Sequence, residues 1–338
     1  MTRQSEQFVT LFDSGFLSIG LALYQSLVDH AGPFKLWVIC MDEAAEEQLN
    51  RLALPELETI PVREVETPEL LAVKPDRDRA EYCWTVTPFS AAAVFKRDSQ
   101  VRRVTYVDAD VCFFKDPRIL LQELDASGGH VLITEHAYAP EYDQTATSGR
   151  FCVQFVTFDR SQAAQRVMHW WQQRCLEWCY RRVEDSRFGD QKYLDRWPAL
   201  FGPDVHVLQA TENTLAPWNV QHYALRGAYG VDPVMYHFHG LRLHDDGLVR
   251  LFQDYRIGHA GLMLYRMYLQ TLGDAVSMLR RVGIEPSVQA PPDQIKSGQK
   301  PPERFAALRR LKRKLVPPKL APERRTRIVY GKLKSKHI

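Results

Sequence analysis

The sequence has 338 residues, 45% of them hydrophobic, and a formal net charge of +3, which fits one large α/β domain or two smaller ones. The charge is uneven: residues 296–338 carry 15 Lys and Arg against two acids, while residues 1–295 carry 29 basic and 39 acidic residues. Because the body is acidic, we expect no nucleic-acid partner. No secretory signal or bilayer-length apolar run is visible, which predicts a cytoplasmic protein.

Short apolar runs typical of strands alternate with segments of helical spacing along the chain. Strands are predicted at 7–12, 34–40, 101–110, 130–135 and 151–158, and helices at 16–30, 42–53, 161–184 and 252–282. This alternation predicts an α/β fold with a mostly parallel central sheet flanked by helices. Ligands of such sheets bind at the carboxyl ends of the strands.

Two aspartates, Asp108 and Asp110, stand at the end of the strand predicted at 101–110. A carboxylate beside hydrocarbon is unfavourable unless it is protonated, paired or bound to a cation. Residues two apart on an extended strand share a face, so both aspartates could hold one Mg²⁺ or Mn²⁺ ion. The alternative is that they cap a helix or pair with Arg102, Arg103 or Lys115.

No phosphate-binding glycine loop of the G-x-x-x-x-G-K-[ST] or G-x-G-x-x-G type occurs in the sequence. A diphosphate ligand would therefore depend on a metal ion for charge neutralisation. The pattern favours metal-assisted diphosphate chemistry over a backbone phosphate cradle.

Four segments stand in order along the chain: FVTLFDSGFLSIGLALYQSL (8–27), VTYVDADVCFF (104–114), FGDQKYLDRWP (188–198) and YHFHG (236–240). Together they resemble the nucleotide-sugar glycosyltransferases with the GT-A fold, most closely glycosyltransferase family 8 and bacterial relatives that build surface polysaccharide. The resemblance spans roughly residues 7 to 245. It implies a GT-A-like fold with a C-terminal helical extension, and transfer of a sugar from a nucleotide diphosphate.

The resemblance implies a divalent cofactor, Mn²⁺ or Mg²⁺, bound by Asp108, Asp110 and His237. Gly240 completes the H-x-x-G segment that selects His237. His239 is the alternative ligand, since two histidines on an extended segment share a face.

The resemblance also implies a donor site in which several further segments take part. Its expected residues are Thr10, Leu11, Phe12, Asp13, Trp84, Thr85, Lys96, Tyr106, Ala109 and Gln154. For Asp13 the alternative is a cap on the following helix, and for Lys96 an exposed, solvated side chain. Where many relatives carry asparagine and glycine, this chain has Cys152 and Gln154, and we hypothesise that Gln154 replaces the lost amide in contacts with the donor sugar or acceptor.

Asp190 and Gln191 occupy the positions that in retaining relatives approach the reacting sugar, Asp190 as a hydrogen-bond anchor and Gln191 beneath the anomeric carbon. The alternative for Asp190 is a helix N-cap. Trp218 is expected to stack on a sugar and Asn219 to bind its hydroxyls, unless 216–223 is simply a rigid turn. The polar loop 137–150 is expected to close over substrate.

We expect four parts along the chain: a transferase domain (1–250), a helical extension (251–284), a Pro-rich linker (285–302) and a basic amphipathic tail (303–338). In ERFAALRRLKRKLV (303–316), apolar residues share one helical face and cations surround it. This pattern is typical of a helix on an anionic membrane surface. The alternative is a helix docked on the acidic body.

The sequence therefore predicts a metal-dependent, retaining glycosyltransferase at the inner face of the membrane. Its donor is expected to be a UDP-sugar and its acceptor a saccharide or lipid-linked molecule, in surface polysaccharide or lipopolysaccharide synthesis. One alternative is a sugar-phosphate nucleotidyltransferase, but TLFDSGFLSIG lacks the basic, Gly-rich phosphate loop. Another is a non-catalytic nucleotide-sugar sensor or scaffold at the membrane.

Overall fold

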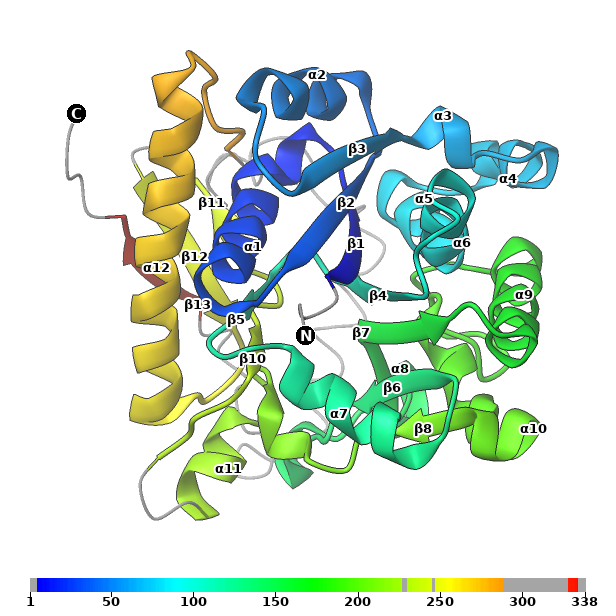
Figure 1. Ribbon diagram of the computed structural model, residues 1–338. Coiled ribbons are helices and arrows are strands. Elements are labelled where there is room, and N and C mark those ends of the chain that lie inside the picture. The colour runs from blue at the N-terminus through cyan, green and yellow to red at the C-terminus, as the bar shows by residue number, and fades with distance from the viewer. Residues whose placement is uncertain (1–4, 227–229, 245–246, 289–327, 334–338) are drawn as a thin grey trace, which may run out of the picture.

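The computed structural model describes residues 5–226, 230–244, 247–288 and 328–333. Its centre is a seven-stranded sheet in the order β3-β2-β1-β4-β7-β6-β8 (Figure 1). These strands are β1 (Glu6–Phe12), β2 (Phe34–Cys40), β3 (Leu57–Pro61), β4 (Arg103–Val107), β6 (Val131–Glu135), β7 (Phe151–Asp159) and β8 (Val205–Val207). Only β7 runs antiparallel to its neighbours, β4 and β6. The predicted mostly parallel α/β sheet is confirmed.

The register of the sheet brings several chain segments to one edge. β1 pairs with β2 from Glu6 opposite Phe34 to Phe12 opposite Cys40, so the two strands end together. β4 is also parallel to β1, with Phe8 opposite Thr105. The residues that follow β1, β2 and β4 therefore meet at the carboxyl edge, where parallel sheets bind ligands.

Helices cover both faces of the sheet, which explains why most residues of its central strands are apolar and buried. One face packs against α1 (Leu17–His30), α2 (Glu43–Leu52), α7 (Arg118–Ser127) and α12 (Gly258–Arg281). The other packs against α3 (Val62–Val65), α4 (Pro68–Val73), α5 (Arg79–Val86), α6 (Ser90–Arg97), α9 (Gln162–Glu177) and α10 (Trp197–Phe201). Along β1, Phe8 and Phe12 enter the first core, whereas Val9 and Leu11 enter the second.

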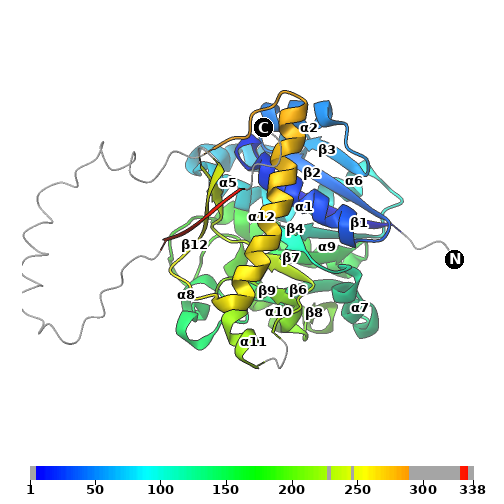
Figure 2. The same cartoon turned by 90° about the vertical axis from the view of Figure 1, so that its left-hand side faces the viewer.

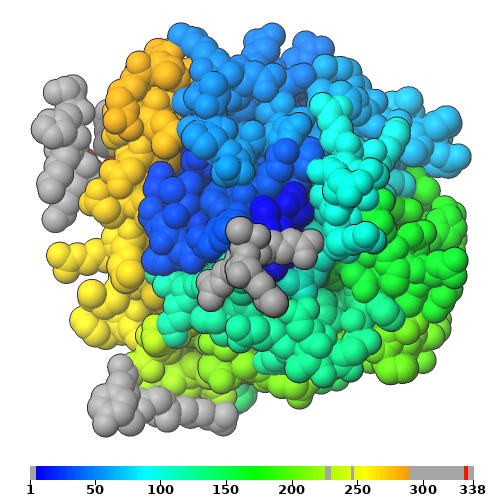
Figure 3. Space-filling model, in the orientation of Figure 1, coloured from blue at the N-terminus to red at the C-terminus, as the bar shows by residue number. Residues whose placement is uncertain are grey.

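Helix α12 lies along α1 and extends the first core outward (Figure 2). Its Tyr265, Tyr268 and Leu272 are fully buried. In the space-filling view α12, coloured yellow to orange, runs along one side of the molecule (Figure 3). The C-terminal helical extension is thus packed against the sheet domain through α1.

Two small sheets complete the fold. Strand β10 (Met235–His237) lies between β5 (Val111–Phe113) and β9 (Thr214–Leu215), and β12 (Leu248–Gln253) lies between β11 (Arg242–Leu243) and β13 (Ile328–Lys332). The remaining helices are α8 (Thr145–Ser148), α11 (Val220–Arg226), η1 (Ser14–Phe16), η2 (Lys74–Asp76), η3 (Thr87–Phe89), η4 (Pro140–Tyr142), η5 (Gln191–Arg196), η6 (Gly202–Asp204) and η7 (Thr211–Asn213).

Three predicted elements differ from the structure by three residues or more at one end. The strand predicted at 101–110 ends at Val107, because the next residues form a turn closed by a hydrogen bond from the Val111 nitrogen to the Asp108 carbonyl. The helix predicted at 161–184 ends at Glu177. The helix predicted at 252–282 begins at Gly258, because the residues up to Gln253 belong to β12. The predicted boundary between the transferase domain and the helical extension, at residue 250, falls within that strand.

Most of the predicted linker and tail lies outside the described residues, including the helix expected over 303–316. Residues 328–332 form β13, which pairs antiparallel with β12. Within the described ranges, no helix combines the length and the apolar character needed to cross a bilayer.

Candidate metal site and its surroundings

Four acidic and histidine side chains converge beyond the carboxyl end of β4. The Nε2 atom of His237 lies 3.0 Å from Oδ1 of Asp110 and 3.9 Å from Oδ2 of Asp108. Ligand atoms of Asp110, His237 and His239 all lie within 4.8 Å of one another. The structure thus brings together the three predicted ligands and places the alternative, His239, beside them. Carboxylate oxygens and imidazole nitrogens form a donor set that fits Mn²⁺ or Mg²⁺.

The pairing of β5 with β10 creates this arrangement. β5 starts directly after the Asp108–Asp110 turn, and its Val111 lies opposite His237 in the antiparallel register. A main-chain hydrogen bond of 2.8 Å from the Phe238 nitrogen to the Asp110 carbonyl adds to this pairing. Phe238 itself is buried and stacks on Tyr268 of α12 at 3.9 Å between ring centroids. The histidine segment is therefore held by packing on both sides.

The electrostatics of the cluster favour positive charge at its centre. Burial raises the pKa of Asp108, an effect that His237 only partly offsets. Burial also opposes ionisation of Asp110, but His237 outweighs it and lowers the pKa of that carboxyl. The pKa of His237 is in turn raised well above its usual value, because Asp110 outweighs the effect of burial. Two carboxylates around one imidazole form a site in which a cation is stabilised.

Two side chains of the central sheet support the ligands. The hydroxyl of Tyr106, at the end of β4, donates a hydrogen bond to Oδ1 of Asp108 at 2.9 Å. Gln154, in β7, lies 2.9 Å from Nδ1 of His237 through its Oε1 atom. Ala109, between the two aspartates, is buried, and Gly240 has a φ of +79° that closes the histidine segment. Tyr106 and Gln154 are therefore in contact with the ligands rather than at a distance from them.

Asp190 lies close to the metal cluster in the interior. It is 5% exposed, and burial together with the charge of Asp108 raises its pKa well above the usual range. Its main-chain carbonyl accepts a hydrogen bond of 2.9 Å from the Trp171 indole. Asp190 stands at the N-cap position of η5, as the alternative expects, although its carboxylate lacks the usual capping hydrogen bond.

Trp218 and Asn219 are both buried beside the histidines. The Trp218 ring meets His237 edge to face at 5.4 Å, and its indole nitrogen donates to the His136 carbonyl at 2.7 Å. Asn219 donates to the same carbonyl at 3.0 Å and accepts from the Ala216 nitrogen at 2.9 Å. Both ends of the Asn219 amide are thus used within the chain, so the rigid-turn interpretation describes it better than the predicted bonding to sugar hydroxyls.

The other predicted donor residues divide between the carboxyl edge and positions away from it. Asp13 caps η1 by accepting from the Gly15 nitrogen at 2.8 Å, and it also forms an ion pair with Arg79. Trp84 is half-buried and packs against Phe188, just before Asp190. Buried positions in β1 are held by Thr10, Leu11 and Phe12.

Two further predicted donor residues, Thr85 and Lys96, lie on helices α5 and α6. Thr85 is buried and donates to the Glu81 carbonyl of its own helix at 2.8 Å. Lys96 is exposed in the last turn of α6, which leads to the beginning of β4 and not to its carboxyl end. The structure therefore does not bring Lys96 to the carboxylates, in agreement with the solvated alternative.

Two arginines beside the cluster were missed by the sequence reasoning. Arg242 and Arg250 lie opposite each other in the β11–β12 pair, and Arg242 packs over the Phe16 ring at 4.8 Å. Among the described residues, neither guanidinium forms an ion pair with a carboxylate. Like charges opposite each other in a sheet are unfavourable, so the pair is suited to an anionic ligand. The alternation of polar and apolar residues on either side of HDDG (244–247) is typical of a hairpin, and it is the sequence signal that would have indicated the opposed arginines.

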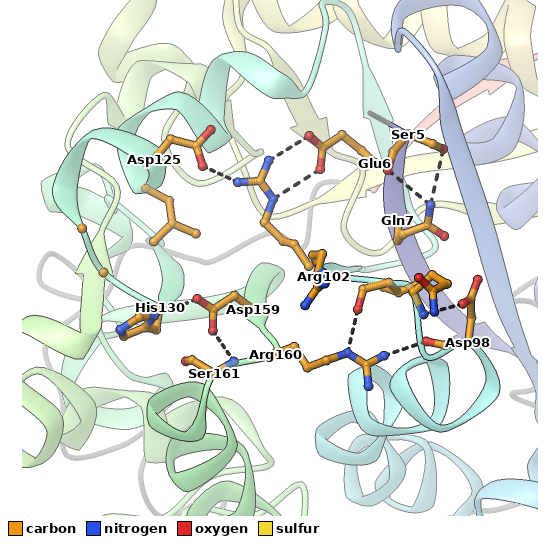
Figure 4. A pocket seen from close by; sticks show the side chains of 16 residues that line it. Ser5, Glu6, Gln7, Asp98, Arg102, Asp125, His130, Asp159, Arg160 and Ser161 are labelled. Atoms are coloured by element: carbon orange, nitrogen blue, oxygen red, sulfur yellow. Dashed lines mark hydrogen bonds and ion pairs between the residues drawn. The ribbon is translucent and has the colours of Figure 1, made fainter. Parts of the chain in front are cut away.

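A hollow of about 920 Å³ lies at the opposite, amino edge of the sheet (Figure 4). Apart from Arg102, its charged side chains form hydrogen bonds or ion pairs within the described part of the protein. Arg103 pairs with Glu6 at 2.8 Å and with Asp125, and Arg160 donates to the main-chain carbonyl of Asp98 at 2.6 Å. This hollow is therefore not part of the candidate metal site, which lies at the other edge of the sheet.

Solved structures with this architecture include two glycosyltransferases. Galactosyltransferase LgtC, in complex with donor and acceptor sugar analogues, is 16% identical with a TM-score of 0.51, and the match covers 79% of this chain and 95% of that one. The bifunctional glycosyltransferase WbbM is 12% identical with a TM-score of 0.51 over 83% of this chain and 52% of that one. At these identities the likeness confirms the predicted GT-A-like fold.

Sequence relatives are closer. The uncharacterised protein YfnD of Bacillus subtilis (strain 168) is 31% identical over 267 residues, which are 75% of this chain and 84% of YfnD. The uncharacterised protein YfnF of the same organism is 30% identical over 250 residues, which are 70% of this chain and 82% of YfnF. No family model matches the sequence. By these extents of identity, the chain belongs to the same protein family as YfnD and YfnF.

Proposed function

We propose that the protein is a metal-dependent glycosyltransferase that moves a sugar from a nucleotide-diphosphate sugar, with UDP expected, to a saccharide or lipid-linked acceptor. The observation that carries this proposal is the cluster of Asp108, Asp110, His237 and His239 at the carboxyl edge of a GT-A-like sheet. LgtC, which shares the fold, was solved with donor and acceptor sugar analogues, which supports the same class of ligands.

Asp108, Asp110 and His237 would hold Mn²⁺ or Mg²⁺, with His239 within reach as a fourth ligand. The ion would supply Lewis-acid stabilisation of the charge on the departing diphosphate. Arg242 and Arg250 would add positive charge for that diphosphate beside the same cluster. Arg242 lies between Phe16, which follows β1, and Asp110, so it connects the expected nucleotide and metal positions.

Asp190 and Gln191 would face the transferred sugar. Asp190 is buried with a raised pKa, which suits a hydrogen-bond anchor better than an exposed carboxylate nucleophile. With family 8 as the closest resemblance, we expect retention of the anomeric configuration. The biological role that we propose is surface polysaccharide or lipopolysaccharide synthesis at the inner membrane face, with the basic tail on anionic lipid.

The test screens a panel of nucleotide-sugars with and without Mn²⁺. It measures the melting temperature of the protein by thermal shift and the release of sugar from each donor. A ligand that binds only the native state raises the melting temperature, and the rise grows as the ligand concentration increases relative to Kd. Asp110→Asn should abolish the metal-dependent shift and the turnover. The matched control is Asp125→Asn, an exposed carboxylate that pairs with Arg103 at the opposite edge of the sheet.

Each outcome of this screen decides between functions. Metal-dependent turnover that is lost only in Asp110→Asn supports the transferase. Binding without turnover under every acceptor would instead favour the nucleotide-sugar sensor. Turnover that survives Asp110→Asn would overturn the assignment of the metal site.

A further inference from the structure

Gln154 is a buried amide in the middle of β7, where most residues are apolar. It is 0% exposed in β7, where the neighbours Val153 and Phe155 are also buried. A buried amide is unfavourable unless both of its ends are hydrogen-bonded. In the described part of the chain its Nε2 atom has no partner, whereas its Oε1 atom lies 2.9 Å from Nδ1 of His237. Stability of the strand therefore does not by itself explain why this position holds an amide.

The main chain of the same residue contacts a second ligand. The Gln154 carbonyl accepts a hydrogen bond of 3.2 Å from the Asp108 nitrogen, next to the pairing of Phe155 with Val107. One residue of β7 thus contacts Asp108 through its backbone and His237 through its side chain. These two ligands come from different sheets, β4 and β10. Gln154 connects the two halves of the cluster.

The hydrogen bond at Nδ1 decides which nitrogen of His237 faces the carboxylates. With Nδ1–H donated to Oε1 of Gln154, the Nε2 atom points to Asp110 at 3.0 Å. A ligating histidine commonly donates its other ring nitrogen in this way, which fixes the ring and raises its basicity as a ligand. Trp218 and His239 pack on the ring at 5.4 and 5.5 Å, so they restrict its position without specifying which nitrogen is free.

We propose that Gln154 is a positioning residue that holds the Nε2 atom of His237 toward the cation site. This inference rests on the proposed metal-dependent function and assigns Gln154 a role different from the donor or acceptor contact expected from the sequence. It also explains why the amide in β7 is glutamine, whose side chain is longer than that of asparagine and reaches a histidine on a separate sheet.

The test measures Mn²⁺ affinity directly, by titration of the full-length protein with the free Mn²⁺ signal followed in electron paramagnetic resonance. Gln154→Met keeps the length of the side chain but removes its acceptor, and it also removes the unpartnered Nε2 atom. We expect this variant to fold and to bind Mn²⁺ about 10–100-fold more weakly. Gln154→Glu keeps an acceptor oxygen and should bind at least about tenfold more tightly than Gln154→Met.

The matched control is Thr157→Val, which removes another fully buried polar group from the same strand. Thr157 contacts Thr105 at 3.0 Å and none of the ligands. It should bind Mn²⁺ like the wild type, and all variants should be compared in melting temperature without metal. Wild-type affinity in Gln154→Met, or equal weakening in Thr157→Val, would overturn the positioning role alone. A wild-type protein that binds no Mn²⁺ would overturn the proposed metal-dependent function as well.

Discussion

The side-chain amide of Gln191 donates a hydrogen bond of 2.8 Å to the main-chain carbonyl of Ser148. The next residue, Lys192, donates from Nζ to the Thr145 carbonyl at 2.6 Å. Helix η5, which directly follows Asp190, therefore holds the loop 137–150 that the sequence analysis expects to close over substrate. The residue expected beneath the anomeric carbon is also the anchor of that loop.

Gln191→Ala should loosen the loop. Because one neutral hydrogen bond contributes about 1 kcal/mol, amide hydrogen exchange in 140–150 should become roughly fivefold faster. The measurement is exchange followed by mass spectrometry. Gln172→Ala is the control, since Gln172 donates to the Pro88 carbonyl at 3.2 Å on another part of the surface. Unchanged exchange in Gln191→Ala would show that Lys192 and the backbone hold the loop without Gln191.

Gly20 allows α1 to pass close to the end of β1. A Cβ atom on Gly20 would lie 2.3 Å from Cε1 of Phe12, which is itself buried. Gly20→Ala should therefore lower the free energy of unfolding by about 1–3 kcal/mol through overpacking. Gly273→Ala is the control in α12, where nothing lies within 4 Å, and it should raise that free energy by about 0.5–1 kcal/mol. Urea unfolding compares the two, and equal effects would contradict the packing argument.

His136 predicts a pH dependence of stability. Burial lowers its pKa to about 3, so the folded state keeps the imidazole neutral while the unfolded state protonates it near pH 6.5. The stability is present above pH 6.5 and is lost as pH falls toward 3. This one group should lower the free energy of unfolding by about 1 kcal/mol between pH 7 and 5.5.

His136→Phe should remove that part of the pH dependence. The phenyl ring should keep the stacking on Tyr138, whose ring centroid lies 4.6 Å from that of His136 in the unchanged protein. Unfolding free energies at pH 7 and 5.5 provide the measurement. The same slope in both proteins would mean that His136 does not remain neutral in the folded state.

The basic tail predicts membrane binding that can be tested without shortening the chain. Truncation before the tail would also remove β13, which pairs with β12. Substitution of Arg309, Arg310, Lys312 and Arg313 by Gln keeps the chain length and removes four charges. Flotation with vesicles containing phosphatidylglycerol should fall by at least about tenfold, since each cation contributes up to about 1 kcal/mol. Neutral vesicles are the control, and unchanged flotation would contradict the membrane role.

The strands and helices of the sheet domain follow from local patterns. The run 34–40 is apolar except for Lys35 and contains the β-branched Val38 and Ile39, and β2 occupies that range. The end of the predicted strand 101–110 was wrong because alternation cannot show a turn, which here depends on the Val111–Asp108 hydrogen bond and on β5 pairing with a distant strand. Asp108 and Asp110 were predicted as metal ligands from their spacing and from the resemblance, and the structure brings them together with His237.

Local patterns in the sequence were enough to predict the α/β class, the order of the elements and the importance of the two aspartates. This is because side-chain periodicity and short motifs depend on neighbouring residues. Tertiary structure decided the rest of the site. The contact of His237 with Asp110 requires the β5–β10 register, the contact of Gln154 with His237 requires two sheets to meet, and the opposed Arg242 and Arg250 require a hairpin. Hydrogen bonds and ion pairs depend on distances of a few ångströms between residues far apart in the chain, and folding alone sets those distances.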